Sequence, residues 1–446
     1  MWMNNLRSEP NTGAAVLNNP VQKPLQTLVI AWILLFPLLF FVARGTFSFD
    51  RQRSDNMAES QANPVTDTRS GSAYYQAEQL LVYVIVLAVI FPTLPGLADV
   101  LRKNLLVFTL PLFALASTAW SQSPGKTIPF AVFVLMLTGF GVYLGHRFAP
   151  ERQLELFLFV GWATILLSFL AVVFLPNAGI EHEDAAGAWR GMFVQKNHCG
   201  EIMVLMLYPA FFAKPKSELQ KFGLVMYVLM GTVIVIMSQS RTAWIIYFLS
   251  LCFIGFIKLF QKLASRERLL LIVSLIAISV VAAALAITYA PQIALLLGKD
   301  PTLTGRTKIW AAVADAVAKK PVLGYGYKAF WQGLTGESLN VGLAVGATAL
   351  TNSENAVLEI WLELGLVGVL IMLFTLFQAS RNAFTCLSHG GSKYIHWYSM
   401  IVFFNVIALV DGGKVMFPHT IEWLLLVVAY VGLANEARKI RQLRTA

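Results

Sequence analysis

Long apolar runs alternate with short polar segments along almost the whole 446-residue chain. A helix of roughly 20 apolar residues is long enough to cross the hydrocarbon core of a membrane. The pattern therefore predicts an all-α integral membrane protein with about twelve transmembrane helices. They are expected near residues 26–43, 78–97, 105–120, 128–145, 154–175, 200–212, 222–237, 242–260, 269–290, 355–378, 397–409 and 421–434. The sixth run is short, which is typical of a re-entrant or tilted segment.

One polar excursion, residues 291–354, interrupts this pattern before the tenth helix. A long segment without regular structure is usually either functional or disordered, and the defined placement of Arg, Trp and Tyr in this one favours function. The predicted organisation has five parts: an N-terminal tail (1–25), helices one to nine (26–290), the long loop (291–354), helices ten to twelve (355–434) and a basic tail (435–446).

Composition supports a membrane protein and charge placement predicts its orientation. Only 13% of the residues are charged and 57% are hydrophobic, whereas soluble domains carry about a quarter charged residues. Short loops with two or more basic residues fall on the side of the N-terminus, so both termini are expected in the cytoplasm and the long loop outside. The net charge of +10 is explained by this topology and not by nucleic acid. Three scattered cysteines imply no disulfide framework.

Four basic residues are expected at the outer ends of helices: Arg190, Lys196, Arg241 and Arg306. A guanidinium group donates two parallel hydrogen bonds to phosphate oxygens, and a lipid-linked pyrophosphate lies at this depth. We therefore expect these residues to bind a donor pyrophosphate. The alternative is that each is an ordinary interfacial cation that contacts lipid headgroups.

Glu354 precedes the tenth helix and is the candidate catalytic residue, as a general base for a sugar hydroxyl. It is also a residue type that is favourable near any helix N-terminus. Four residues are expected to position the substrate: Asn197, Asn355, Trp310 and Tyr327. The alternative is that the two asparagines are helix caps and that the two aromatic residues lie at the membrane interface. Glu359 and Glu363 share a helix face and suit a structural role. Neither a metal site nor a cofactor is predicted.

Several short motifs occur in a characteristic order. They are Trp120-Ser121 with Pro124, Met192–Asn197 with Gly200, Ser238–Thr242, Gly305–Trp310, Pro321–Gly326, and Glu354–Glu359 with Leu364–Leu366. With them the chain resembles the bacterial O-antigen ligase and Wzy-type polysaccharide polymerase superfamily. Residues 324–331 are most similar to the rhizobial-type exopolysaccharide repeat-unit polymerases.

This resemblance implies a metal-independent glycosyltransferase in the bacterial inner membrane, with its active site facing the periplasm. A polymerase of this kind transfers an oligosaccharide from undecaprenyl pyrophosphate to a second lipid-linked repeat unit. A ligase transfers it to lipid A core. Arg190, Arg241 and Arg306 match positions implicated in pyrophosphate binding. The family commonly has His-Asn where this chain has Glu354-Asn355. Either Glu354 is the base, or the chemistry depends on other residues, or this homologue works differently. Membrane lipids, a chain-length regulator and export proteins are the implied partners.

A flippase or transporter of lipid-linked sugars is the rival from another class. Transporters tend to place polar groups or broken helices near the bilayer midplane in two corresponding halves. The sequence shows no repeat between its halves. A structural partner of an export complex is a third possibility, but such a protein would not need the arginine set.

Overall fold

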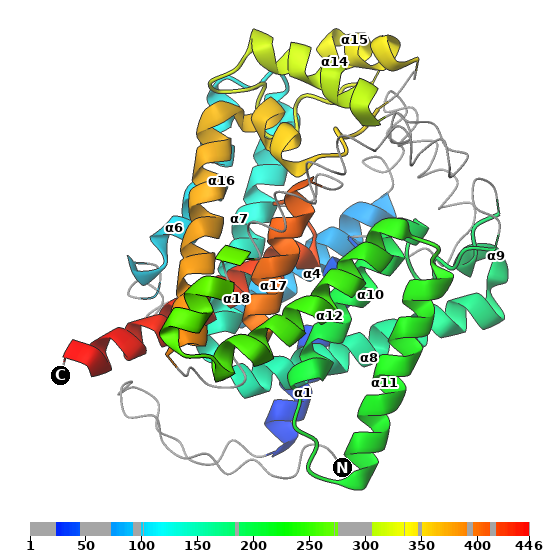
Figure 1. The fold of residues 1–446 in the computed structure, drawn as a ribbon. Helices are drawn as coiled ribbons and strands as arrows, with labels where there is room; N and C mark the ends of the chain where they lie inside the picture. Colours follow the sequence, from blue (N-terminus) through cyan, green and yellow to red (C-terminus); the bar gives the residue numbers. More distant parts are fainter. Residues whose placement is uncertain are drawn as a thin grey trace.

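The structure, a computed structural model, is almost entirely helical in the parts of the chain that it describes. These are residues 24–44, 73–91, 100, 102–182, 187–271, 273–274, 306–333, 335–346, 350–389, 396–410 and 416–445. Its helices are α1 (Pro24–Val42), α4 (Ala73–Ile90), α6 (Leu105–Ala116), α7 (Pro124–Arg147), α8 (Pro150–Phe174), α9 (Pro176–Gly179), α10 (Lys196–Phe212), α11 (Glu218–Met237), α12 (Arg241–Lys262), α14 (Arg306–Lys319), α15 (Gly336–Val345), α16 (Ala356–Ser388), α17 (His396–Ile407) and α18 (Ile421–Thr445) (Figure 1).

The helices form the bundle of an all-α membrane protein. Five of them, α7, α8, α11, α12 and α16, are long and apolar enough to cross a membrane. Large apolar side chains such as Phe222 and Phe248 point outward, as lipid-facing residues do. Eleven predicted spans fall on described helices. The ninth, 269–290, lies mostly outside the described residues, so the number twelve stays a prediction.

Helix α10 occupies the centre of the bundle. It packs against α8, α11, α12 and α17, and every residue from His198 to Ala210 is buried. The sequence predicted a short segment that begins at residue 200. The helix instead begins at Lys196 and contains 17 residues, because its polar first turn continues directly into the apolar run.

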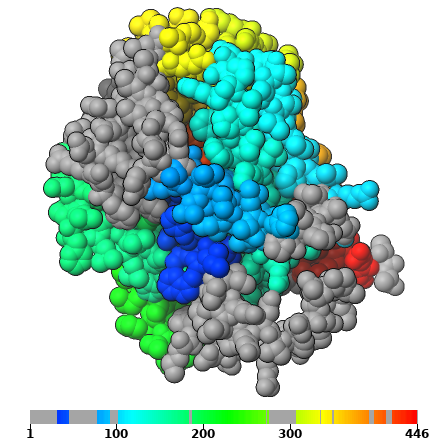
Figure 2. All heavy atoms as spheres, turned by 180° about the vertical axis from the view of Figure 1, so that it is seen from behind, coloured from blue at the N-terminus to red at the C-terminus, as the bar shows by residue number. Residues whose placement is uncertain are grey.

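One end of the bundle, which we call the loop end, carries α14 and α15 together with the starts of α7 and α16 (Figure 1). At the opposite end Phe260 of α12 packs on Phe384 of α16. Arg268 also donates a 2.8 Å hydrogen bond to Ser388 O there. Helices α12 and α16 therefore end together. Viewed from behind, the yellow surface of the 330–345 region lies beside the cyan surface of α7 (Figure 2).

The predicted loop 291–354 is more ordered than its polarity indicated. It contains two helices, α14 and α15, which pack on each other, and α14 also packs on α16. A small separate core joins them, and its members are Val313, Ala316, Val317, Tyr325, Phe330, Val341 and Leu362. Residues 291–305, with Gly305 of the expected motif, lie outside the described residues.

Helix α16 is broken at Gly365, whose φ of 69° and ψ of −171° are not helical. The segment Pro321–Gly326 inserts at this break and pairs with the backbone groups that lose their partners within the helix. The four hydrogen bonds run from Tyr325 N to Leu362 O (2.9 Å), from Gly326 N to Glu363 O (2.8 Å), from Leu366 N to Pro321 O (2.9 Å) and from Val367 N to Val322 O (3.3 Å). The insertion therefore replaces two helical hydrogen bonds with four bonds to the loop.

Glycine is required where these two backbones touch. A Cβ atom on Gly365 would lie 2.1 Å from Val322 O, and one on Gly324 would lie 2.6 Å from the carbonyl carbon of Glu363. Both glycines also have positive φ angles, which L-residues with side chains rarely adopt. The Pro321–Gly326 motif is thus explained by its fit into α16.

Replacing Gly365 with Ala is expected to destabilise the protein, because backbone strain alone costs about 1–3 kcal/mol and the steric overlap adds to it. Gly139→Ala is the matched control, since nothing lies within 4 Å of the added Cβ in α7. Thermal unfolding in detergent measures the difference. An unfolding midpoint for Gly365→Ala equal to that of Gly139→Ala would contradict this account of the break.

Candidate functional site

The starts of α10 and α12 lie side by side. A Cβ atom on Gly200 would be 2.7 Å from Ala243 Cβ in the first turn of α12, so the glycine permits this close approach. The preceding loop joins the same place, because Trp189 N–H donates a 2.8 Å hydrogen bond to Met237 O. The 195–200 and 238–242 motifs, separate in the sequence, therefore form one surface.

Each of these two helices begins with a cation, Lys196 in α10 and Arg241 in α12. A cation at a helix N-terminus is electrostatically unfavourable, because the helix dipole is positive there. Arg241 is exposed and Lys196 half-buried. Within the described part of the chain, no carboxylate forms an ion pair with either side chain. The Glu181 carboxylate does accept the backbone N–H of Lys196 at 3.3 Å. The surface as a whole is suited to an anion.

Arg190 lies in the loop before α10 and is buried, with 7% of its surface exposed. Its Nε donates to Ala178 O at 2.8 Å and its Nη2 to Asn177 O at 3.2 Å. These bonds direct part of the guanidinium toward the backbone of α9. Arg190 thus holds the loop in place and adds positive charge beneath it.

Arg306 and Glu354 form an ion pair at the loop end. Arg306 Nη2 lies 3.2 Å from Glu354 Oε2, and the side chains are 30% and 35% exposed. A pair this exposed contributes only about 0–1 kcal/mol, so an anionic ligand can compete for Arg306. The sequence placed both residues outside but gave no signal that they contact each other.

The turn that presents Glu354 is held by hydrogen bonds on both sides. Glu354 itself has a φ of 52°, a backbone conformation that residues other than Gly and Asn rarely adopt. Its N–H donates to Asn352 Oδ1 at 2.8 Å, and Ser353 Oγ donates to Asn355 O at 2.8 Å. Asn355 is the N-cap of α16 and accepts from Val357 N and Leu358 N.

The other predicted positioning residues differ in their access to solvent. Asn197 is exposed in the first turn of α10, whose N-cap is Gln195. Trp310 is half-buried on α14, one helical turn after Arg306. Tyr327 is 1% exposed and donates to Met416 O at 2.7 Å. Burial raises the pKa of Tyr327 well above its usual value, and the Glu363 charge acts in the same direction, so its phenol stays neutral.

A buried charge cluster that the sequence did not predict lies next to the inserted segment Pro321–Gly326. Lys328 Nζ is 2.9 Å from Glu363 Oε1 and 3.9 Å from Glu359 Oε1. The spacing of the two glutamates predicted their shared face. Nothing in the sequence indicated that Lys328 is their partner, because the contact depends on the break in α16.

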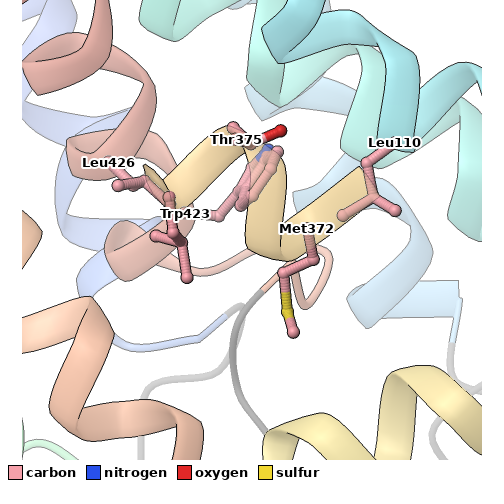
Figure 3. Close-up of a pocket in the computed structure, with 6 residues that line it drawn as sticks. Leu110, Met372, Thr375, Trp423 and Leu426 are labelled. Carbon is pink, nitrogen blue, oxygen red and sulfur yellow. The ribbon is translucent and has the colours of Figure 1, made fainter. Parts of the chain in front are cut away.

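In the described part of the chain, Arg241 and the Arg306–Glu354 pair are not in direct contact. No hydrogen bond or ion pair there joins Arg241 to the Arg306–Glu354 pair. A small apolar cavity lies elsewhere, between α6, α16 and α18 (Figure 3). Its polar lining atoms are already paired, since Thr375 Oγ1 donates to Ile371 O and Trp423 Nε1 to Thr138 Oγ1. This cavity is a packing gap and not a sugar site.

Part of the chain is similar to proteins named for polysaccharide production and ligation. Residues 225–373 match the O-antigen ligase family. The chain is 28% identical to the exopolysaccharide production protein ExoQ of Rhizobium meliloti over 285 residues, 61% of this chain and 63% of that protein. It thus spans less than two thirds of that relative. It is 25% identical to a candidate polysaccharide ligase of Rickettsia felis over 303 residues, 64% of this chain and 71% of that protein.

The region that matches the family contains Arg241, Arg306 and Glu354. The comparisons therefore confirm the predicted resemblance: residues 225–373 of this all-α membrane protein are similar to the O-antigen ligase family.

Proposed function

We propose that this protein transfers an oligosaccharide from undecaprenyl pyrophosphate to the hydroxyl group of an acceptor glycan. The observation that supports this most strongly is the pair of cations, Lys196 and Arg241, at two adjoining helix N-termini. Two cations at adjoining helix N-termini are electrostatically unfavourable in the protein without a ligand, and such an arrangement is expected where an anion binds. The ligase family and the exopolysaccharide relative supply the substrate class.

In this proposal the donor diphosphate lies against the starts of α10 and α12, and Arg190 strengthens the field from below. The developing negative charge on the leaving group is stabilised by Lys196, Arg241 and Arg306, the task that a divalent metal performs in many other glycosyltransferases. Pyrophosphate is a good leaving group, so positioning and charge stabilisation are the main requirements.

The reaction itself is a displacement at the anomeric carbon. The bond from the acceptor oxygen to that carbon forms while the bond to the pyrophosphate oxygen breaks. Undecaprenyl pyrophosphate leaves with the electron pair of the broken bond, and the acceptor proton passes to Glu354. Diphosphate binding draws Arg306 away from Glu354 and so frees the carboxylate to act as the base.

Polymerisation of lipid-linked repeat units is the reaction that we favour, since the exopolysaccharide relative is the more similar of the two. Ligation to lipid A core is the alternative, which the family name favours. The loop end faces the periplasm and both termini lie in the cytoplasm of the inner membrane. Asn197, Asn355 and Trp310 border the sugar chain, whereas Tyr327 supports the site from the core.

Deleting the gene and analysing the glycans distinguishes the two reactions. Loss of a polymerase is expected to leave single repeat units on the lipid carrier at the periplasmic face. Full-length polymer that lacks attachment to lipid A core would instead identify a ligase. Accumulation on the cytoplasmic face would contradict both and favour a flippase.

Replacing Arg241 or Arg306 with Ala should reduce transfer by about 100-fold or more, because each removes a charge that stabilises the leaving group. Lys308→Ala is the matched control: this exposed cation lies two residues after Arg306 and so points to another side of α14. Membrane content is measured by immunoblot and transfer by polymer length. Normal polymer from both arginine variants would overturn the site.

Glu354→Gln is expected to lower turnover by about 100-fold while the donor KM stays within about twofold, since the amide keeps the shape but cannot take a proton. Steady-state assays on membranes supply both constants. Unchanged turnover would remove Glu354 from the chemistry and leave the diphosphate site standing.

A further inference from the structure

Glu359 is buried in the first turns of α16, where both of its carboxylate oxygens accept hydrogen bonds. Only 2% of its surface is exposed. Oε1 accepts from Trp331 Nε1 at 2.9 Å, and Oε2 accepts from Ser353 N–H at 2.9 Å. The second bond reaches back past Asn355, the N-cap of its own helix.

This bond anchors the turn that carries Glu354. Ser353 is fully buried, and on the far side of Glu354 the N-cap Asn355 is fixed by its bonds to α16. Glu354 therefore lies between two anchored residues, in a left-handed conformation that persists only where the surroundings impose it. Without the bond from Ser353 N–H to Glu359, the turn loses one of the contacts that oppose its relaxation, and relaxation would move the Glu354 carboxylate from its present place.

The inserted loop supplies what allows a carboxylate to be buried here. Lys328, with 11% of its side chain exposed, lies between Glu359 and Glu363, and Trp331 comes from the same segment. A buried carboxylate without such partners is strongly destabilising. The residues shortly after Pro321–Gly326, the segment inserted at the break in α16, are thus the ones that contact Glu359.

We propose that Glu359 is a positioning residue for the transfer reaction: through the Ser353 N–H it fixes the turn that presents Glu354 to the acceptor. This proposal rests on the function proposed above. Lys328 acts one step further away, by neutralising the Glu359 carboxylate.

Glu359→Gln tests the proposal at constant side-chain size. The Lys328 ammonium lies nearer Oε1, so the single amide oxygen should turn toward Lys328 and Trp331, leaving an NH2 group against the Ser353 N–H. Turnover is expected to fall about 10- to 100-fold, as for a misplaced catalytic group, with the donor KM within about twofold. Trp331→Phe is the control, because it removes the other 2.9 Å bond to the same carboxylate but not the anchor. It should keep turnover within about twofold.

The assay uses purified protein in nanodiscs and lipid-linked oligosaccharides extracted from cells that lack it, with monodisperse elution as the check on folding. Glu359→Asp is the second variant if Glu359→Gln does not fold: it keeps the charge beside Lys328 but withdraws it from Ser353, and it too should lose turnover. Equal losses in Glu359→Gln and Trp331→Phe would show a general packing role and overturn the proposal.

Glu354→Gln, measured in parallel, separates failure of this proposal from failure of the proposed function. If Glu354→Gln is inactive while folded Glu359→Gln or Glu359→Asp turns over like wild type, the positioning role is wrong and the proposed function stands. If Glu354→Gln turns over like wild type, the catalytic role of Glu354 falls, and the positioning role falls with it.

Discussion

The structure depends on how the broken helix α16 satisfies its backbone. Each unpaired amide in an apolar interior costs several kcal/mol, and the break at Gly365 leaves four backbone groups without helical partners. The segment Pro321–Gly326 pairs with all four. This pairing replaces the missing helical bonds and at the same time fixes the outer segment to the bundle.

The candidate site follows from that attachment. Because the segment is bound to α16, Lys328 and Trp331 reach Glu359, and α14 places Arg306 within 3.2 Å of Glu354. The second half of the site, at the starts of α10 and α12, has a different support: Gly200 lets the two helix starts approach each other closely. Two independent sets of contacts thus hold the proposed base and the proposed anion surface, a division suited to a reaction with a charged leaving group and a neutral acceptor.

The sequence predicted the features that depend on local pattern. Apolar periodicity located the helices, and residue order located the family resemblance. The sequence could not predict the break in α16, because its apolar run continues through Leu364-Gly365-Leu366. The helix breaks there only because a distant segment inserts. The partners of Lys328, Arg306 and Arg190 were missed for the same reason: each is a long-range contact. The ordered helices α14 and α15 were obscured by a polar composition that resembles a loop.

The central claim is that two cation-bearing helix starts form a diphosphate site. Its most direct test is binding of undecaprenyl pyrophosphate and undecaprenyl monophosphate to the purified protein by microscale thermophoresis, with wild type and the Lys196→Ala/Arg241→Ala double variant. The account predicts that wild type prefers the diphosphate, that high salt weakens this preference, and that the double variant binds the diphosphate at least about tenfold more weakly, a loss of about 1.4 kcal/mol. Equal diphosphate affinity in wild type and the folded double variant would contradict it.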